Sequence, residues 1–487
     1  MGDDAQKPTY DDLAALVRDL RARVADLEAE RARDKARIAE LERQLAAAKK
    51  NSSNSSKPPS SDITSPPKTK QKKRRGGKPR IGGQPGHRRA ESNLTIKDAD
   101  EEQCYYADQA PENAGRDLVP APGLEPKVLF QYELADKPVI LTAHISHPYI
   151  DTETEEVVYA PFPREVEMGG ILGPRLTSYC ACLKGGIHAS YTGVKKVLDM
   201  LHVDVCRSTI CNKLKKVCEA LGFSVAELNS ELPNQEQLNV DESGHKDHPF
   251  DKPKDHKKKH WIWVFAAPLF TVFRIFNTRS ADVLKEVLGP DCEAIIGSDL
   301  YSAYTCYAKT ASVQIQLCWA HLIRDIKFLD ESPNKVTANY GSRLLELCKK
   351  IFHLQHRREE LDEEVFRQRM WKLKQQFLDT GRRSKAVGAG NMINRLKDHG
   401  EEYFLFLENP QIEPTNNLAE REVRHCVIDR RVTQGTRGLD GQRWCECIWT
   451  VLATCARQRR NSFEFIAESV RTFYSGEPQP SLLPAQQ

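Results

Sequence analysis

The sequence predicts a multidomain protein of mixed α+β and α/β class. Three observations lead to this prediction. An apolar heptad pattern runs through residues 1–50, short stretches of alternating apolar and polar residues occupy 95–165, and a strand, hairpin, helix and strand pattern begins near residue 233. At 487 residues the chain is also longer than one hydrophobic core usually serves, which favours several domains.

The first predicted element is a coiled coil over residues 1–50. Its apolar seam, set in a background of Ala, Glu and Arg, consists of Leu13, Val17, Leu20, Val24, Leu27, Ile38, Leu41 and Leu45. Arg31 and Asp34 interrupt the seam, which weakens an extended dimer but can fix its register. We expect the chain to form a homo-oligomer through this segment. The alternative is a single amphipathic helix on the globular body.

Residues 51–94 are expected to form a disordered basic linker. The part from 51 to 62 is rich in Ser, Asn and Pro and offers too little apolar surface to offset the entropy of ordering. The flexible cationic tract that follows suits the phosphate backbone of DNA. Its predicted DNA-binding residues are Lys72, Lys73, Arg74, Arg75, Lys78 and Arg80. A solvated basic tail without a dedicated partner is the alternative.

Two smaller modules are expected next. The alternation in 95–165 predicts a small β-rich module. Residues 166–232 have a helical pattern, with a break at 202–206 and Ser208 as the expected cap of a second helix over 209–221. This outline fits a helix-turn-helix that binds DNA and fits an ordinary helical hairpin equally well.

Residues 233–475 carry the pattern with the most chemical information. A short strand ends at Asp241, an antiparallel pair of strands follows at 261–276, and a helix at 280–288 leads to a strand that ends in Asp299. This order of elements is that of ribonuclease H-like folds, in which the first and fourth strands lie side by side. We therefore expect Asp241 and Asp299 to lie close together.

Paired acids of this kind predict a metal site. Two carboxylates a few ångströms apart repel each other unless cations lie between them, and oxygen ligands suit Mg²⁺ or Mn²⁺. A third acid, Glu420, begins a later helix, with Asn417, Arg421 and Arg424 on neighbouring turns. A carboxylate flanked by an amide and arginines suits a metal and phosphates together. A salt-bridged surface helix is the alternative for this segment.

Ordered motifs extend along almost the whole chain. They are Lys50 to Asp62, Gly82-Gly83-Gln84-Pro85-Gly86-His87, Val240-Asp241-Glu242-Ser243, Ser298-Asp299-Leu300-Tyr301, Cys318-Trp319-Ala320-His321-Leu322 and Pro414 to Arg421. This set resembles the main transposase of the insertion sequence 66 family. The resemblance implies a DNA transposase with a ribonuclease H-like domain, in which Asp241, Asp299 and Glu420 form a DDE triad that binds two Mg²⁺ or Mn²⁺ ions.

The resemblance also implies partners and an insertion. Element ends and target DNA would be the substrates, small accessory proteins of the same element would assist, and the location would be the bacterial cytoplasm at the nucleoid. The segment between Asp299 and Glu420, which lie 121 positions apart, would contain a helical insertion at about 330–405. Trp371, within it, is a candidate for stacking on an unpaired base, with a place in the core as the alternative.

Cysteine and histidine positions bear on zinc. Cys318 and His321 form a C-x-x-H pair, which we expect to support the active site or nearby DNA, with simple packing as the alternative. Relatives carry two cysteine pairs after the Gly-Gln-Pro-Gly-His element, whereas this chain has Cys104 followed later by His144 and His147. Because a structural zinc site needs four ligands, we expect a degenerate module without zinc. A partial site of these three residues is the alternative.

The remaining features narrow the functional class. The chain has no run of eighteen apolar residues and no basic-then-apolar start, so we expect no membrane partner, and residues 476–487 are expected to form a tail. Two other functions fit the same patterns. One is a metal-dependent nuclease without joining activity, and the other is a non-catalytic DNA-binding protein derived from a transposase.

Overall fold

The structure is a computed structural model that describes residues 10–48, 94–106, 126–248, 258–384 and 388–484, together with residues 109, 111, 114, 115, 117 and 386. The predicted basic residues from Lys72 to Arg80 and the motifs at 50–62 and 82–87 lie outside the described residues. The chain divides into two compact units: one contains Met1–Pro67, His144–Met200 and Asp204–Gln487, and the other contains Lys68–Ala143 with Leu201–Val203.

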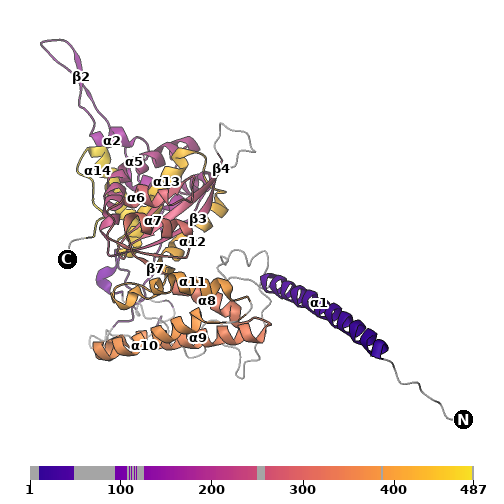
Figure 1. Ribbon diagram of the computed structural model, residues 1–487. Coiled ribbons are helices and arrows are strands. Elements are labelled where there is room, and N and C mark those ends of the chain that lie inside the picture. The colour runs from indigo at the N-terminus through magenta and orange to yellow at the C-terminus, as the bar shows by residue number, and fades with distance from the viewer. Residues whose placement is uncertain are drawn as a thin grey trace. The chain divides into compact units, whose positions relative to one another are not determined.

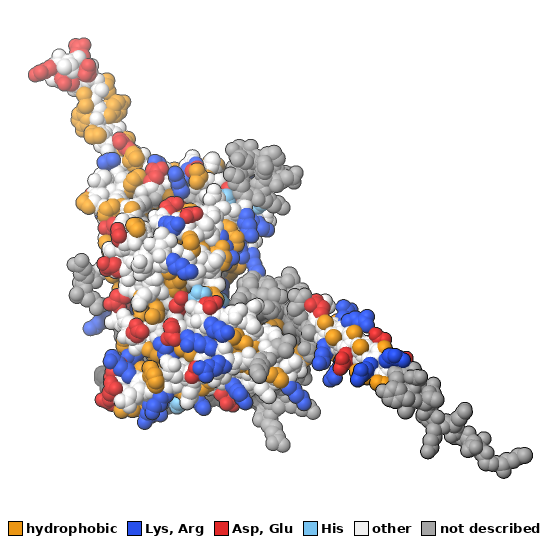
Figure 2. Space-filling view, viewed as in Figure 1, with side chains coloured by type: hydrophobic (Ala, Val, Ile, Leu, Met, Phe, Trp, Pro, Cys, Tyr) orange, Lys and Arg blue, Asp and Glu red, His pale blue; other side chains and the backbone are white. Residues whose placement is uncertain are grey.

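Helix α1 (Tyr10–Ala48) is a continuous helix of 39 residues, as the heptad pattern predicts. The apolar side chains of its seam that the structure describes are exposed: Val17, Leu20, Val24, Leu27, Ile38 and Leu41. Figure 2 shows them among acidic and basic side chains on the helix surface. The helix is therefore present, and its pairing into a coiled coil stays a prediction.

The described part of residues 95–165 contains a short 3-10 turn, η2 (Ile96–Asp98), and one two-stranded ribbon. Strands β1 (Pro148–Ile150) and β2 (Val157–Tyr159) pair in antiparallel fashion, and every residue in both is exposed. Figure 2 shows hydrophobic side chains along this ribbon and acidic ones at its tip. Within its described residues, the predicted β-rich module thus forms strands without a buried core.

Helices α2 (Arg164–Gly169), α3 (Pro174–Gly185), α4 (Tyr191–Met200) and α5 (Arg207–Glu231) follow. Helix α5 has 25 residues and extends far beyond the predicted 209–221. It begins directly after Cys206, so Ser208 lies inside the helix and the predicted cap is wrong. Tertiary packing extends the helix, because its buried face contacts α3, α13 and α14. A DNA-reading role for α4 and α5 stays a prediction.

A five-stranded sheet in the order β5-β4-β3-β6-β7 forms the centre of the larger unit (Figure 1). Its strands are β3 (Gln237–Asp247), β4 (Lys258–Ala266), β5 (Thr271–Phe276), β6 (Ile295–Ser298) and β7 (Ile315–Leu317). Strands β3, β4 and β5 are antiparallel, whereas β6 pairs parallel to β3 and to β7. The expected pairing of the first and fourth strands is thus present.

One strand boundary differs from the prediction. Strand β3 continues to Asp247, so Asp241 lies in the middle of a strand and not at its end. The second half of β3 contains Glu242, Ser243 and Gly244, which give no apolar alternation. It is held as a strand by the β4 ladder and by a bridge from Asp247 to the distant residue Thr436.

Helices cover both faces of the sheet. These are α6 (Asp282–Leu288), α7 (Ser302–Ala311), α12 (Asn417–Val432) and α13 (Leu439–Arg457), while α14 (Ser462–Ser475) packs against α3 and α5. Glu242 on β3 bonds Tyr304 of α7, and its neighbour Ser243 bonds Arg430 of α12. Successive strand residues point to opposite faces, so α7 and α12 lie on opposite sides of the sheet. The core includes the fully buried Trp263 and Trp449.

The predicted helical insertion lies between β7 and α12. It consists of α8 (Trp319–Asp330), α9 (Lys335–His356), α10 (Glu363–Arg382) and α11 (Gly390–His399), and Figure 1 shows α9 and α10 side by side. Short 3-10 turns, in this region and before β3, are η5 (Leu232–Asn234), η6 (Arg358–Glu360), η7 (Glu401–Tyr403) and η8 (Leu405–Leu407). Among the described residues, every helix is too short or too polar to cross a membrane.

Candidate active site

The three predicted acids come from three elements. Asp241 lies within β3, Asp299 directly follows β6, and Glu420 lies in the first turn of α12. In addition to burial, the negative charges of Asp299 and Glu420 both raise the pKa of Asp241, and the charge of Glu420 also raises that of Asp299. Charge effects of this kind require the carboxylates to lie near one another, and the parallel register of β3 and β6, which pairs Asn239 with Gly297, agrees with this for Asp241 and Asp299. The fold therefore brings these acids together from positions far apart in the sequence.

The segment before α12 is fixed to β3 by side-chain amides. Gln237 donates from Nε2 to the carbonyl oxygen of Glu413 at 3.2 Å and accepts from the Glu413 amide at 2.9 Å. Asn416 donates from Nδ2 to the carbonyl oxygen of Val240 at 2.8 Å. This last bond lies next to Asp241, so the start of α12 is held in register with the first acid.

Burial is the main cause of the raised pKa values at this site. It raises the pKa of Asp241 well above its ordinary range and that of Asp299 to about 6. Burial also raises the pKa of Glu420, although Arg324, whose Nη2 lies 3.3 Å from Glu420 Oε1, opposes this effect. The protein thus holds three carboxylates where their ionised forms are disfavoured.

The residues present fit divalent cations. Asp299 Oδ1 is buried without a hydrogen-bond donor among the described residues, and two further acids lie near it. A buried carboxylate oxygen without a donor costs free energy, and a hard cation would satisfy it. The oxygen donors of Asp241, Asp299 and Glu420 are of the kind that Mg²⁺ and Mn²⁺ prefer.

A fourth acid, Glu242, was not predicted. Its side chain is only 1% exposed and accepts hydrogen bonds from Arg279, one of them from Nε at 2.7 Å, and from the hydroxyl of Tyr304. Its charge is the largest electrostatic influence on Asp299 after burial. Only its place next to Asp241 in the sequence could have suggested this role, because the Arg279 partner comes from the loop after β5.

Cys318 and His321 lie beside Glu420, as expected for residues that support the site. The Nδ1 atom of His321 lies 3.4 Å from Glu420 Oε1, and potential ligand atoms of Cys318, His321 and Glu420 lie within 4.8 Å of one another. Burial lowers the pKa of His321 to about 3, with Arg324 contributing, so the imidazole is neutral. Cys318 is buried, which raises its pKa, and its sulfur accepts from the Asn416 amide at 3.1 Å.

The other predicted residues of α12 lie further out. Asn417, Arg421 and Arg424 are all exposed, and among them Arg424 opposes through its charge the rise that burial causes in the pKa of Glu420. The inward amide belongs to Asn416, which is 1% exposed. The helix turns Asn417 and Arg421 toward solvent, because the buried side of α12 carries Ala419, Val423 and Cys426, and a role of the exposed residues in contacting DNA stays a prediction.

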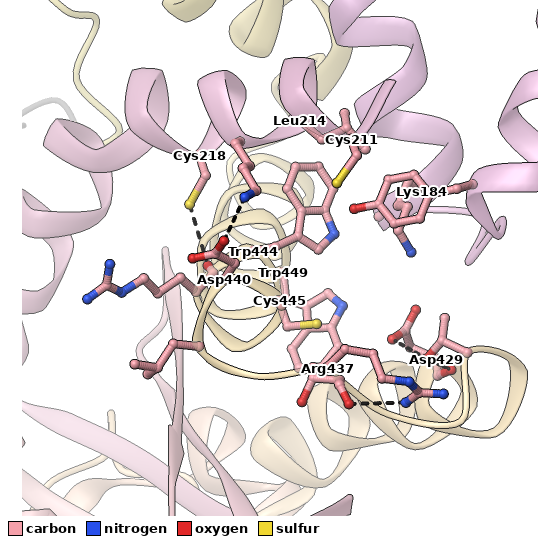
Figure 3. A pocket seen from close by; sticks show the side chains of 18 of the residues that line it. Lys184, Cys211, Leu214, Cys218, Asp429, Arg437, Asp440, Trp444, Cys445 and Trp449 are labelled. Carbon is pink, nitrogen blue, oxygen red and sulfur yellow. Dashed lines mark hydrogen bonds and ion pairs between the residues drawn. The ribbon is translucent and has the colours of Figure 1, made fainter. Parts of the chain in front are cut away.

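A separate cavity of about 840 Å³ lies between α5, α12 and α13 (Figure 3). Its lining includes Lys184, Cys211, Trp444, Cys445 and Trp449, and none of the three acids contributes to it. Lys215 pairs across it with Asp440 at 2.7 Å. The three acids and this cavity thus lie at different places in the domain.

A sequence model described as Transposase IS66 family matches residues 169–443, which is more than half of the chain. The chain belongs to this family. The match confirms the resemblance inferred from the motifs, gives the protein a role as a transposase and implies that it binds DNA. It spans α3 to α12 and contains all three acids. A second model, described as a family of unknown function, matches residues 3–93, and no curated protein matches the chain.

Proposed function

We propose that the protein is a DDE transposase that binds the ends of its insertion sequence, cleaves a DNA strand and joins it to target DNA. Its catalytic residues are Asp241, Asp299 and Glu420, and they bind two divalent ions, Mg²⁺ or Mn²⁺. The observation that carries this proposal is the convergence of the three acids around an Asp299 oxygen that has no donor among the described residues. Strand order and directions support a ribonuclease H-like domain.

The site residues have separable roles in this reaction. When bound, the metal pair activates a water or a 3′ hydroxyl and stabilises the leaving oxygen of the phosphodiester. Asn416 fixes the start of α12 against β3, which positions Glu420 beside Asp241. Arg324 orients the Glu420 carboxylate, and the neutral His321 beside it adds no positive charge that would compete with a cation.

Other parts of the chain complete the proposed transposase. Helix α1 would join copies through its exposed apolar seam, as the pairing of two DNA ends requires. The basic residues from Lys72 to Arg80 would bind the DNA backbone, and α4 with α5 would contact element ends. Small accessory proteins of the same element are further proposed partners.

Strand transfer tests the proposal. A labelled element-end duplex is incubated with plasmid, Mg²⁺ or Mn²⁺ and any accessory proteins, and the wild type is compared with Asp241→Asn, Asp299→Asn and Glu420→Gln. Each variant should reduce joined product by at least roughly 100-fold, since each removes one carboxylate of the metal site. The exposed controls Asp291→Asn and Glu408→Gln should retain wild-type joining.

The alternative functions give different products in the same assay. Cleaved duplex without joined product would favour a nuclease. Bound duplex that is neither cleaved nor joined would favour a non-catalytic DNA-binding protein. Joining that survives in any of the three variants would contradict the assignment of that acid.

A further inference from the structure

The outer half of the β3–β4 ribbon carries two lysines directly opposite each other. Lys246 on β3 faces Lys259 on β4 in the ladder, and both side chains are exposed. Neither forms an ion pair with a residue that the structure describes. Like charges at directly opposed positions destabilise a pair of strands. The pair therefore indicates an anionic partner at this end of the ribbon.

Aromatic side chains continue from these lysines toward the acids. The Lys259 ammonium lies 4.6 Å from the centroid of the Trp261 ring, and the Arg279 guanidinium lies 4.9 Å from the same ring. Arg279 also lies 3.8 Å from the centroid of Tyr301, which is two positions after Asp299. Cationic and aromatic groups thus alternate from the tip of the ribbon to the edge of the candidate active site.

The alternation of β3 and β4 places this set on one face of the sheet. Glu242, Gly244 and Lys246 share a face of β3, and they pair with Trp263, Trp261 and Lys259 of β4. Gly244, opposite Trp261, leaves open space, because a Cβ atom added there would meet no atom within 4 Å. Trp261 and Tyr301 are both partly exposed. A planar group can therefore approach this part of the ribbon.

The two cations near Trp261 differ in how firmly they are held. Arg279 is fixed by its bonds to the buried carboxylate of Glu242. Lys259 is exposed and forms no such bond among the described residues, so a planar ligand could displace its ammonium from the ring. The freed ammonium would remain close enough to bind a charge on the same ligand.

We propose that Lys246, Lys259, Trp261 and Tyr301 form a binding strip for single-stranded DNA beside Asp299, on the face of the sheet opposite the side chain of Asp241. One nucleobase stacks on Trp261, and the two lysines bind the flanking phosphates. Arg279 is the cation of the strip that stays fixed. The combination of phosphate-binding cations and stacking rings is the one by which proteins bind single strands. This inference rests on the proposed function and names a DNA segment bound beside Asp299.

Binding in EDTA tests the strip without any catalysis. Fluorescence anisotropy gives the Kd of a labelled single-stranded oligonucleotide and of the matching duplex for the full chain. Trp261→Ala should weaken single-strand binding roughly 5- to 100-fold and leave duplex binding within about twofold, because a duplex offers no unstacked base. Trp261→Phe should restore most of the affinity, which separates stacking from a folding defect.

The lysines are tested by salt dependence. Lys246→Gln combined with Lys259→Gln should reduce the slope of log Kd against log salt by roughly 1.4, about 0.7 for each phosphate that no longer meets a lysine. The control pair Lys285→Gln with Lys309→Gln removes the same charge from exposed sites on α6 and α7 and should leave the slope within about 0.3 of the wild type.

Two results would contradict the proposed binding strip. One is unchanged single-strand affinity in Trp261→Ala, and the other is an equal loss of single-strand and duplex affinity in this variant. Failure of the proposed catalytic function gives a different pattern, since joining would then be absent while single-strand binding would still depend on Trp261.

Discussion

Replacing Asp299 by Asn should stabilise the metal-free protein. The fold holds this carboxylate near Glu242 and Glu420, and burial with the charges of these two acids raises its pKa from 3.8 to about 6. An asparagine keeps the shape of the side chain and removes the charge. A residue that only served the stability of the fold would give the opposite result, because its removal would destabilise the protein.

The magnitude follows from the pKa difference. A pKa of about 6 in the folded state against 3.8 when unfolded corresponds to a cost of about 3 kcal/mol at pH 7.5, where both forms are ionised. The folded state binds the proton more tightly, so this cost is absent below the unfolded pKa and grows as the pH rises through 6. It falls to about half by pH 5 and nearly disappears by pH 4.

Thermal unfolding in EDTA measures this gain between pH 4.5 and 7.5. We expect the Asp299→Asn variant to have a Tm several degrees above the wild type at pH 7.5, with a difference that shrinks as the pH falls. Added Mn²⁺ should raise the Tm of the wild type more than that of the variant. The exposed Asp291→Asn serves as the control. A variant that is no more stable than the wild type at pH 7.5, or equally stabilised at every pH, would refute the reasoning.

Three further perturbations test other parts of the structure. Gly341→Ala should lower the free energy of unfolding in denaturant by several kcal/mol, because its Cβ would overlap the backbone of α8. Gly222→Ala, in the open part of α5, should raise it by about 0.5–1 kcal/mol. Equal effects of the two variants would contradict the close packing at Gly341. Asn416→Ala should cost about 1–3 kcal/mol and reduce strand transfer at least tenfold, with the exposed Asn391→Ala of α11 near wild type in both assays. His321 has a pKa of about 3, below its unfolded value of 6.5, so it should make the wild type lose about 2 kcal/mol more stability than His321→Gln between pH 7 and pH 5; equal losses would show that the imidazole is not held neutral.

The sequence was sufficient for the order of the strands in the sheet, whereas the role of the three predicted acids stays a proposal. Apolar runs and their spacing predicted β4, β5, β6 and the intervening α6, because each is locally amphipathic or locally apolar. The second half of β3 was missed because its residues are polar on both faces. Its extended conformation depends on the β4 ladder and on Thr436, nearly two hundred positions later. Contacts over that distance leave no local periodicity.

The bounds of the second predicted helix before the sheet were missed in a similar way. Ser208 is a strong capping residue by type, yet α5 begins earlier and buries Leu214, Val217 and Leu221 against other helices. Local capping contributes about 1 kcal/mol, and burial of three such side chains contributes several times more. Packing therefore decided where the helix ends, and the sequence pattern showed only that a helix was present.

The residues around the three acids also divide into those that the sequence predicted and those that it did not. Cys318 and His321 were predicted because they form a compact motif after Asp299, and they do lie beside Glu420. Glu242 and Arg279 were missed because their bond joins a polar strand residue to a loop. Sequence periodicity shows which residues of one helix or strand share a face. A contact between two elements that meet only in the folded protein leaves no such pattern in a single sequence.

The way in which the helical insertion joins the sheet explains how the third acid keeps its place. The insertion leaves the sheet at Trp319 and returns at Pro414, and the Trp319 amide donates to the Pro414 carbonyl at 3.0 Å. The two ends of the insertion are therefore joined by this hydrogen bond, which lies next to the bond between Asn416 and Cys318. Because Gln237 and Asn416 connect the returning segment to β3, the position of Glu420 depends on these short contacts. Because Arg324 and His321 of α8 also contact Glu420, it is α9 and α10, further from the sheet, that can differ in length without displacing Glu420 from Asp241.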